Sequence, residues 1–134
     1  MPAGRAVVVV RHIVLRLAEA SVEDIKARYD LGEVVCTLRR VMPRAAAALE
    51  LNAVAKSMGI HASALRRYAR VTEAIGGPEF AQLLRLRTAR GMSLTWSHVE
   101  HLAMVHDPAR RKALAAAAAD EALSVRALAQ RLRR

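Results

Sequence analysis

Apolar residues recur every three or four positions along most of this chain, which is the spacing of one helical face. Glycine, proline and capping residues divide the pattern into separate segments. The sequence therefore predicts a compact all-α fold of six or seven helices. The expected helix starts lie at Ser21, Pro43, Pro78, Ser93 or Thr95, Asp107 and Ser124, with a further helix after the turn at Gly59.

The N-terminal segment, residues 6 to 19, fits two structures. A helix would align four polar side chains in one stripe, Arg5, His12, Arg16 and Glu19. A strand would place Val7, Val9, Ile13, Leu15 and Leu17 on one face, and the run of valines favours β geometry. We favour the helix because the rest of the chain is helical, whereas a strand would pair with a second copy. Residues 1–20 are accordingly predicted to be an arm or dimerisation segment, and residues 21–134 a helical domain.

Ser21 is the predicted N-cap of the following helix, with Asp24 in its first turn. Gly32 weakens the middle of this helix and is expected to mark a bend. Further along, Pro78 is expected to begin a helix that ends at Gly91. The inner stripe of the helix that follows Ser21 is predicted to be Ile25, Tyr29, Val35, Leu38 and Val41 or Met42.

Residues 51 to 71 have the spacing of a helix-turn-helix, a motif that places its second helix in a DNA groove. Val54, Ala55 and Met58 are the apolar positions of the first helix, and the small Ala55 allows a close crossing. Gly59 follows where the chain must turn, because glycine tolerates a left-handed backbone. Ile60 is expected to fill the turn.

The second helix of this motif has two faces when it is drawn at about 100° per residue. Its inward face carries Leu65, Tyr68, Ala69, Thr72 and Ile75. Its outward face carries Ser63, Arg66, Arg67 and Arg70, and the sequence has no acidic residue between Glu50 and Glu73.

Arginine can grip guanine edges or phosphate oxygens with two donors at once. We therefore expect Arg66, Arg67 and Arg70 to face the major groove of double-stranded DNA, with His61 and Ser63 at the start of the helix. Lys56 and arginines of the two flanking helices are expected to hold phosphates. The alternative is that this surface is the solvated face of an ordinary helical hairpin.

The charge of the chain points to the same class of partner. Lys and Arg number 22 against 12 Asp and Glu, which gives a net charge of +10. A small protein this basic accumulates on polyanions, of which nucleic acid is the commonest. Only 3% of the residues are aromatic, which argues against a stacking platform for single strands. A membrane surface is disfavoured because no helix combines a basic face with bulky aromatics.

The single cysteine, Cys36, cannot form an internal disulfide and is expected to be a core residue in a reducing cytoplasm. The apolar run near the N-terminus is broken by Arg11, His12 and Arg16. It is therefore too short and too charged to span a bilayer or act as a signal sequence. We expect a cytoplasmic, nucleoid-associated protein.

Candidate chemistry is sparse. His98 and His101 lie three residues apart and could approach one metal, but no carboxylate or cysteine partner accompanies them. Ser97 cannot pair with His98 as nucleophile and base because adjacent helical residues do not face each other. Trp96 is expected to pack in the core. We expect no enzyme activity, no cofactor and no metal.

The segment from Gly91 resembles the DNA-binding module of ParB-type partition proteins. In that family a helix-turn-helix is followed by a G-x-x-S…H-x-x-x-L helix and an LSVR-x-L helix. The matching residues here are Gly91, Ser93, His98 and Leu102, followed by Leu123, Ser124, Val125, Arg126 and Leu128. In these families the equivalent of His98 is a capping or packing residue, which is what the resemblance implies here.

The chain also resembles the helical N-terminal module of bacterial PD-(D/E)XK nuclease-family proteins. The matching residues are Tyr29, Leu31 and Gly32, then Trp96, Ser97 and His98, then Asp107 with Arg110 or Arg111. Together the two resemblances cover roughly residues 29 to 132.

These resemblances imply a DNA-binding module alone. Residues 1 to 50 contain no glycine-rich nucleotide motif of the ParB type, and no acidic nuclease core follows. The expected roles are transcription control, DNA partition or organisation of a chromosome or mobile element, as a homodimer that reads two half-sites. The alternative is an adaptor, or an accessory module of a nuclease system, whose basic face meets an acidic protein partner.

Overall fold

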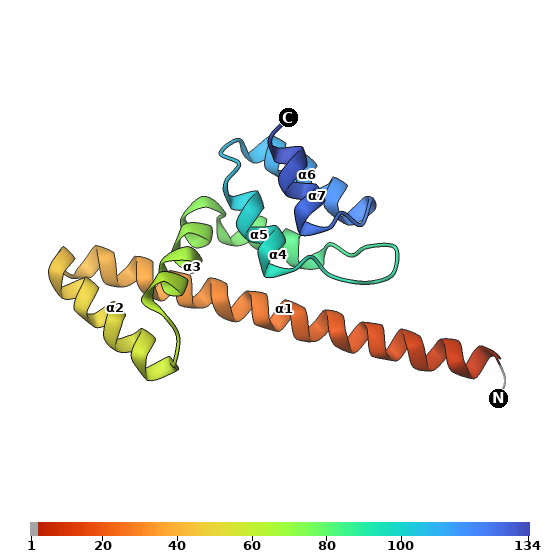
Figure 1. Cartoon of the computed structure of the whole chain (residues 1–134), viewed down its shortest axis with the longest axis horizontal. Coiled ribbons are helices and arrows are strands. Elements are labelled where there is room, and N and C mark those ends of the chain that lie inside the picture. Colours follow the sequence, from red (N-terminus) through yellow and green to blue (C-terminus); the bar gives the residue numbers. More distant parts are fainter. Residues whose placement is uncertain (1–2) are drawn as a thin grey trace.

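The longest element, α1 (Ala3–Val41), runs the length of the molecule (Figure 1). The computed structural model describes the backbone of residues 3–134 and the side chains of residues 16–134. That part of the chain is all-α, with seven helices and an isolated two-residue bridge, so the predicted fold class is confirmed. The other helices are α2 (Arg44–Met58), α3 (Ala62–Ala74), α4 (Gly77–Arg85), α5 (Trp96–Ala103), α6 (Pro108–Asp120) and α7 (Val125–Leu132).

The N-terminal segment is helical, so the strand alternative is wrong. The predicted N-cap at Ser21 is also wrong, because α1 continues through this residue without a break. The physical reason is that the inner face of the helix extends across Ser21, from Ala18 to Ile25, and both are almost fully buried. The division at residue 20 into arm and domain stays a prediction. Of the predicted polar stripe, the side chains of Arg5 and His12 lie outside the described residues.

Gly32 does not bend α1, which passes through it as one helix (Figure 1). Instead, Gly32 is the point where α3 lies closest. A Cβ atom on Gly32 would stand 2.2 Å from Thr72 Oγ1 and 2.5 Å from the carbonyl oxygen of Tyr68. Two hydrogen bonds join the helices nearby, from Tyr29 Oη to the Ile75 carbonyl (2.7 Å) and from Thr72 Oγ1 to the Tyr29 carbonyl (3.0 Å).

The helix that begins at Pro78 is shorter than predicted. It ends at Arg85, and residues 86–95 form a loop closed by a bridge between Arg87 and Ser93. Arg87 also donates to the Leu84 carbonyl (2.6 Å), one of the acceptors that a helix end leaves free. Gly91 has φ 83° and supplies the turn in the loop rather than the end of a helix.

Three other predicted caps are confirmed. Thr95, Asp107 and Ser124 each precede a helix, and their side chains accept hydrogen bonds from backbone N–H groups in the first turn. These caps can be read from the sequence because the bond is local. Residues 113–119, which are alanine except for Leu114, fall inside α6, as the high helix propensity of alanine suggests.

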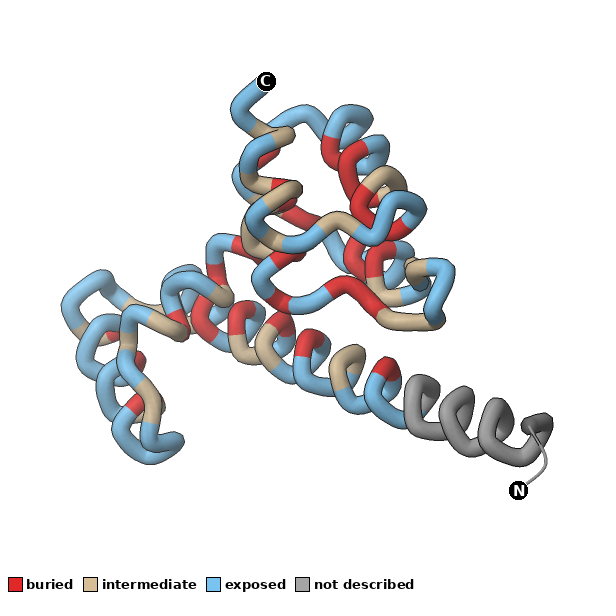
Figure 2. The backbone as a smooth tube through the Cα atoms, turned by 45° about the vertical axis from the view of Figure 1, so that its right-hand side comes forward, coloured by how far each residue is buried: buried red, intermediate tan, exposed pale blue. Residues whose placement is uncertain are grey.

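The buried residues form two clusters on either side of α3 (Figure 2). The larger cluster joins the middle of α1 to α4–α7 and includes Ile25, Phe80 and Leu102. The smaller joins the C-terminal part of α1 to α2 and includes Val35 and Leu51. Because α3 contributes to both clusters, it is held firmly and its outward face is fixed in space. No helix in the described part of the chain is long and apolar enough to cross a membrane.

Candidate nucleic-acid interface

The turn between α2 and α3 has the local geometry that the sequence predicts. Gly59 adopts φ 70°, in the left-handed region, and the Ile60 N–H donates to the Ala55 carbonyl (3.0 Å). Ala55 is 3% exposed, as a close crossing requires. Met58 is a correction, because it is 46% exposed instead of facing the core. It lies in the last turn of α2, beyond the reach of the inner face formed by Ala47, Leu51 and Ala55.

The two predicted faces of α3 are present in the structure. Leu65, Ala69 and Ile75 are buried against α1 and the neighbouring helices. The predicted contact residues of α3 are all exposed, as is His61, the residue just before the helix. These exposed residues are His61, Ser63, Arg66, Arg67 and Arg70.

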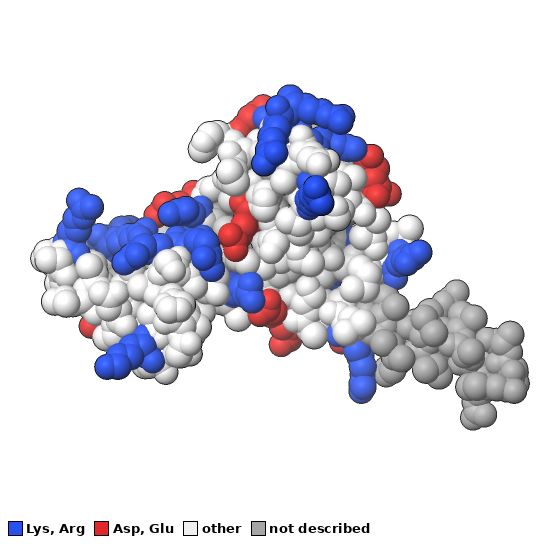
Figure 3. Space-filling model, viewed as in Figure 1, with Lys and Arg blue, Asp and Glu red and all other residues white. Residues whose placement is uncertain are grey.

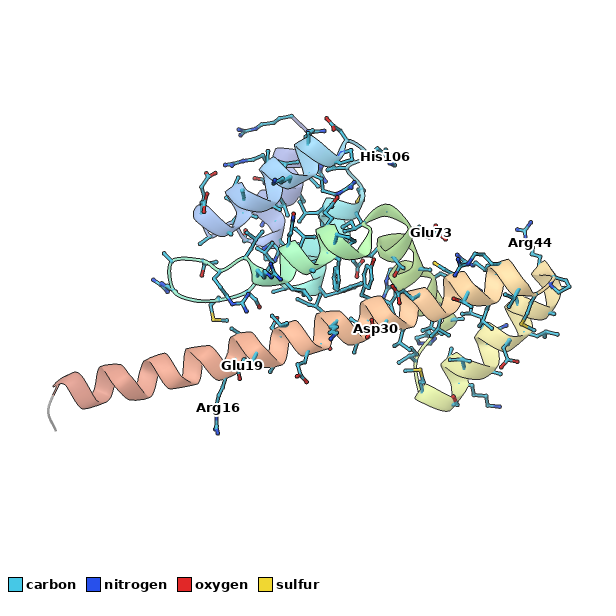
Figure 4. All side chains as sticks on the ribbon, turned by 180° about the vertical axis from the view of Figure 1, so that it is seen from behind. Arg16, Glu19, Asp30, Arg44, Glu73 and His106 are labelled. Carbon is cyan, nitrogen blue, oxygen red and sulfur yellow. The ribbon has the colours of Figure 1, made fainter. Side chains whose placement is uncertain are left out.

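On one edge of this face, Arg66 meets arginines from two other helices. A depression of about 690 Å³ lies between α1, α2 and α3 and is lined by Arg39, Arg44 and Arg66. Figure 4 shows Arg44 projecting outward at the end of the molecule where α1 and α2 meet. Lys and Arg side chains gather over this end in the space-filling view (Figure 3). We call Arg39, Arg44, Arg66, Arg67 and Arg70 the arginine surface.

Arg39 and Arg44 were missed as particular contact residues by the sequence analysis. The available signal was that basic residues stand on both sides of Pro43, at the end of one helix and the start of the next. That signal is weak, because only the folding back of α2 along α1 brings these residues beside Arg66.

On the other edge, Arg67 and Arg70 line a cleft of about 600 Å³ between α3 and α5. The α5 side of this cleft carries Glu100 and His101, and His106 follows the helix. The cleft is therefore mixed in charge, unlike the depression around Arg66. Glu73 and His106 project on the same side of the molecule as Arg44 (Figure 4).

Glu73 is the acidic residue nearest to the arginine surface. Its Oε1 lies 3.4 Å from Nη1 of Arg39, so the two charges partly offset each other. Cys36 also reaches Glu73 and the Ala69 carbonyl through long contacts of 3.8 and 3.9 Å. Burial, with the nearby Glu73 carboxylate, raises the pKa of the Cys36 thiol. Cys36 is therefore a partly buried packing residue and not an activated thiolate.

Lys56 is exposed but stands apart from the arginine surface. It lies near the C-terminal end of α2, whereas Arg44 is the first residue of that helix. Twelve residues of helix separate the two along about 18 Å and turn them about 120° apart. The structure therefore brings Arg44, and not Lys56, beside Arg66.

His98 is held by hydrogen bonds that give it a structural role. Its Nδ1 lies 2.8 Å from Thr95 Oγ1 and 3.1 Å from the Thr95 backbone nitrogen, which completes a capping box. Its Nε2 lies 2.8 Å from the Leu123 carbonyl, in the loop before α7. His101 instead contacts the Ser97 carbonyl of its own helix (2.8 Å). In the part of the chain whose side chains are described, no three His, Cys, Asp or Glu residues are grouped to hold a metal.

Replacing His98 with alanine is expected to lower the free energy of unfolding by about 2 kcal/mol, since the capping box of α5 and the partly buried Leu123 carbonyl both lose their partner. His101→Ala is the matched control and should change stability by no more than about 0.5 kcal/mol. Urea unfolding measures the change in stability of both variants. Added zinc should leave the melting temperature of the wild type unchanged, and a zinc-dependent rise that His98→Ala abolishes would show that these residues bind metal after all.

Trp96 packs in the core, as predicted. It is 4% exposed, and its ring lies nearly perpendicular to the Tyr68 ring at a centroid distance of 5.4 Å. Near the C-terminus, Arg131 makes two contacts with Glu121, at 2.6 and 3.0 Å. That pair lies in the loop before α7 and in α7 itself, away from the arginine surface.

Comparisons with protein-family models, curated proteins and solved structures found no match to this chain. The resemblances to the ParB-type module and to the nuclease-family module therefore stay predictions from the sequence.

Proposed function

We propose that this chain binds double-stranded DNA through a helix-turn-helix, with α3 in the major groove. The observation that carries the proposal is that Arg66, on the outward face of α3, shares one depression with Arg39 of α1 and Arg44 of α2. Arginines from three helices thus lie around the exposed face of a single helix. An α-helix fits in the major groove of DNA, which is about 12 Å wide. Arginines on either side of that helix can contact the phosphates that border the groove.

The residues divide into two groups by their position. Arg66, Arg67 and Arg70 extend from the exposed face of α3 and are the candidates for contacts with base edges. Arg39 and Arg44 stand at the border of that face and are the candidates for phosphate contacts. His61 and Ser63, at the start of α3, complete the proposed interface.

The biological role proposed is transcription control, DNA partition or organisation of a chromosome or mobile element, and DNA binding would place the chain at the nucleoid. Proteins that use phosphate contacts lose affinity steeply as salt rises, because binding releases counterions from the DNA. What separates this proposal from an adaptor with an acidic protein partner is binding to duplex DNA at about 0.15 M salt, because a complex of oppositely charged proteins also weakens as salt rises.

The test is binding of the full chain to random-sequence duplex DNA across a salt series. The triple variant Arg66→Ala/Arg67→Ala/Arg70→Ala is expected to bind about 100-fold more weakly than the wild type, or worse, because each arginine contributes on the order of 1–3 kcal/mol. The slope of log affinity against log salt should stay nearly unchanged if the three arginines contact bases, and should fall by about 0.9 for each of them that contacts a phosphate.

A second triple variant controls for net charge. Arg90, Lys112 and Arg126 are exposed and lie in the loop after α4, in α6 and in α7. Their replacement with alanine also removes three positive charges and should leave most of the affinity for DNA. Equal losses in the two triple variants would mean that binding reflects diffuse charge and that α3 is wrongly assigned. If the wild type does not bind DNA at about 0.15 M salt, the proposal fails and an acidic protein partner becomes the next candidate.

A further inference from the structure

Helix α1 carries a second apolar face that none of the other helices fully covers. Its inner face is buried by the rest of the molecule, as at Ile25 and Tyr29. On the side away from these residues, three large apolar side chains are open to solvent. The exposed fractions are 53% for Leu17, 48% for Val34 and 71% for Val41. Val41 was one of the two alternatives predicted for the end of the inner stripe, and that alternative is wrong, since Val41 faces solvent and Met42 is half-buried.

These exposed residues belong to a regular heptad pattern. From Leu17 to Val41 the positions alternate by three and four residues, and all of them except Asp24 are apolar. We call this set the outer stripe. It consists of Leu17, Ala20, Asp24, Ala27, Leu31, Val34, Leu38 and Val41.

The sequence extends the same spacing toward the N-terminus at Val10 and Ile13. The pattern therefore runs for more than four heptads along one helix. A surface helix of a globular protein needs only one apolar face, whereas a heptad sustained this long is typical of a coiled coil. Leu31 and Leu38 are partly covered by the contact with α2, and the other apolar members of the outer stripe in the described range are exposed.

We propose that the outer stripe binds the outer stripe of a second copy of this chain, so that two α1 helices form a parallel coiled coil. Helix α1 has 39 residues and is about 58 Å long. A helix of similar length with the same spacing can contact the outer stripe along the length that α2 leaves open, and an identical α1 meets both conditions.

The charges beside the outer stripe fit this arrangement. Glu23 and Arg28 lie on opposite edges of the stripe and are five residues apart, which is the separation of ion pairs between parallel, in-register helices. Arg28 is 38% exposed and makes a contact of 3.4 Å with Asp24 of its own helix.

The dimer can be tested without DNA, so its outcome is independent of the proposed function. Sedimentation equilibrium of the full chain should give a mass of two copies, each of 14.6 kDa. Val34→Glu/Val41→Glu should give one copy, because it places two charges in the stripe. Leu49→Glu is the matched control, since Leu49 is 72% exposed on α2 and lies outside the stripe, and this variant should stay dimeric.

Two further variants distinguish the interface from a folding defect. Asp24→Leu should tighten the dimer by about tenfold, because one polar residue in a coiled-coil seam reduces its stability. Ala27→Cys in a Cys36→Ser background should form a disulfide between copies, because identical seam positions meet in a parallel pair. A monomeric wild type, a dimer that survives Val34→Glu/Val41→Glu, or an Asp24→Leu variant that dimerises no better would overturn the proposal. A lack of the disulfide would overturn its parallel register.

Discussion

Replacing Gly32 with alanine is expected to destabilise the protein by about 3 kcal/mol, although alanine is the better helix former. The added methyl group would stand 2.5 Å from the backbone oxygen of Tyr68 and 2.2 Å from Thr72 Oγ1. A side chain could rotate away, but the carbonyl is part of α3. The two helices would have to separate, and the bonds that join Tyr29 to Ile75 and Thr72 to Tyr29 would lengthen with them.

Urea unfolding followed by circular dichroism measures this loss. Gly76→Ala is the control, because a Cβ atom there would meet nothing within 4 Å and the backbone has negative φ. Its effect should stay below about 1 kcal/mol, the cost of alanine in place of glycine at the N-cap of α4. Thr72→Ala combined with Gly32→Ala should recover only part of the loss, since the Tyr68 carbonyl remains. A Gly32→Ala protein as stable as the wild type would show that α1 and α3 do not pack this closely.

Replacing Arg111 with methionine is expected to cost about 3 kcal/mol of stability, at the lower end of the range for breaking a buried ion pair. Arg111 of α6 is 4% exposed, and its guanidinium donates to both carboxylate oxygens of Glu79, at 2.6 and 2.7 Å. It also donates to the Val105 carbonyl (2.6 Å). The hydrogen bonds to Glu79 raise the pKa of Arg111, so the guanidinium keeps its charge.

Loss of Arg111 would leave the Glu79 carboxylate, whose side chain is 26% exposed, without its partner. Thermal or urea unfolding measures the effect, with the exposed neighbour Lys112→Ala as control. Arg111→Met/Glu79→Gln should be more stable than Arg111→Met alone, because the unpaired charge is removed. If the single variant loses no stability, the pair does not link α4 to α6 in the way the distances indicate.

The parts of the fold that follow from local rules could be predicted. The caps at Thr95, Asp107 and Ser124 depend on a side chain and a backbone group two or three residues apart. The left-handed turn at Gly59 depends on the residue itself. The outward face of α3 follows from helical periodicity, and the exposed positions of Arg66, Arg67 and Arg70 agree with it.

Other features depend on residues that are distant in sequence. Ser21 has a good capping side chain, yet burial on both sides of it favours an unbroken helix. Gly32 was expected to bend α1, but its lack of a side chain serves the approach of α3, some forty residues later. Both errors arise because the local preference, about 1 kcal/mol, is smaller than the packing energy it opposes.

By itself, the sequence determined that this protein is all-α, where most of its helices begin, and that α3 presents arginines on one side, because these properties depend on residue spacing and short-range hydrogen bonds. The tertiary structure alone decided that Arg39 and Arg44 stand beside Arg66 and that Arg111 is buried against Glu79. Such contacts join separate helices, and their geometry is set by how several apolar faces pack at once.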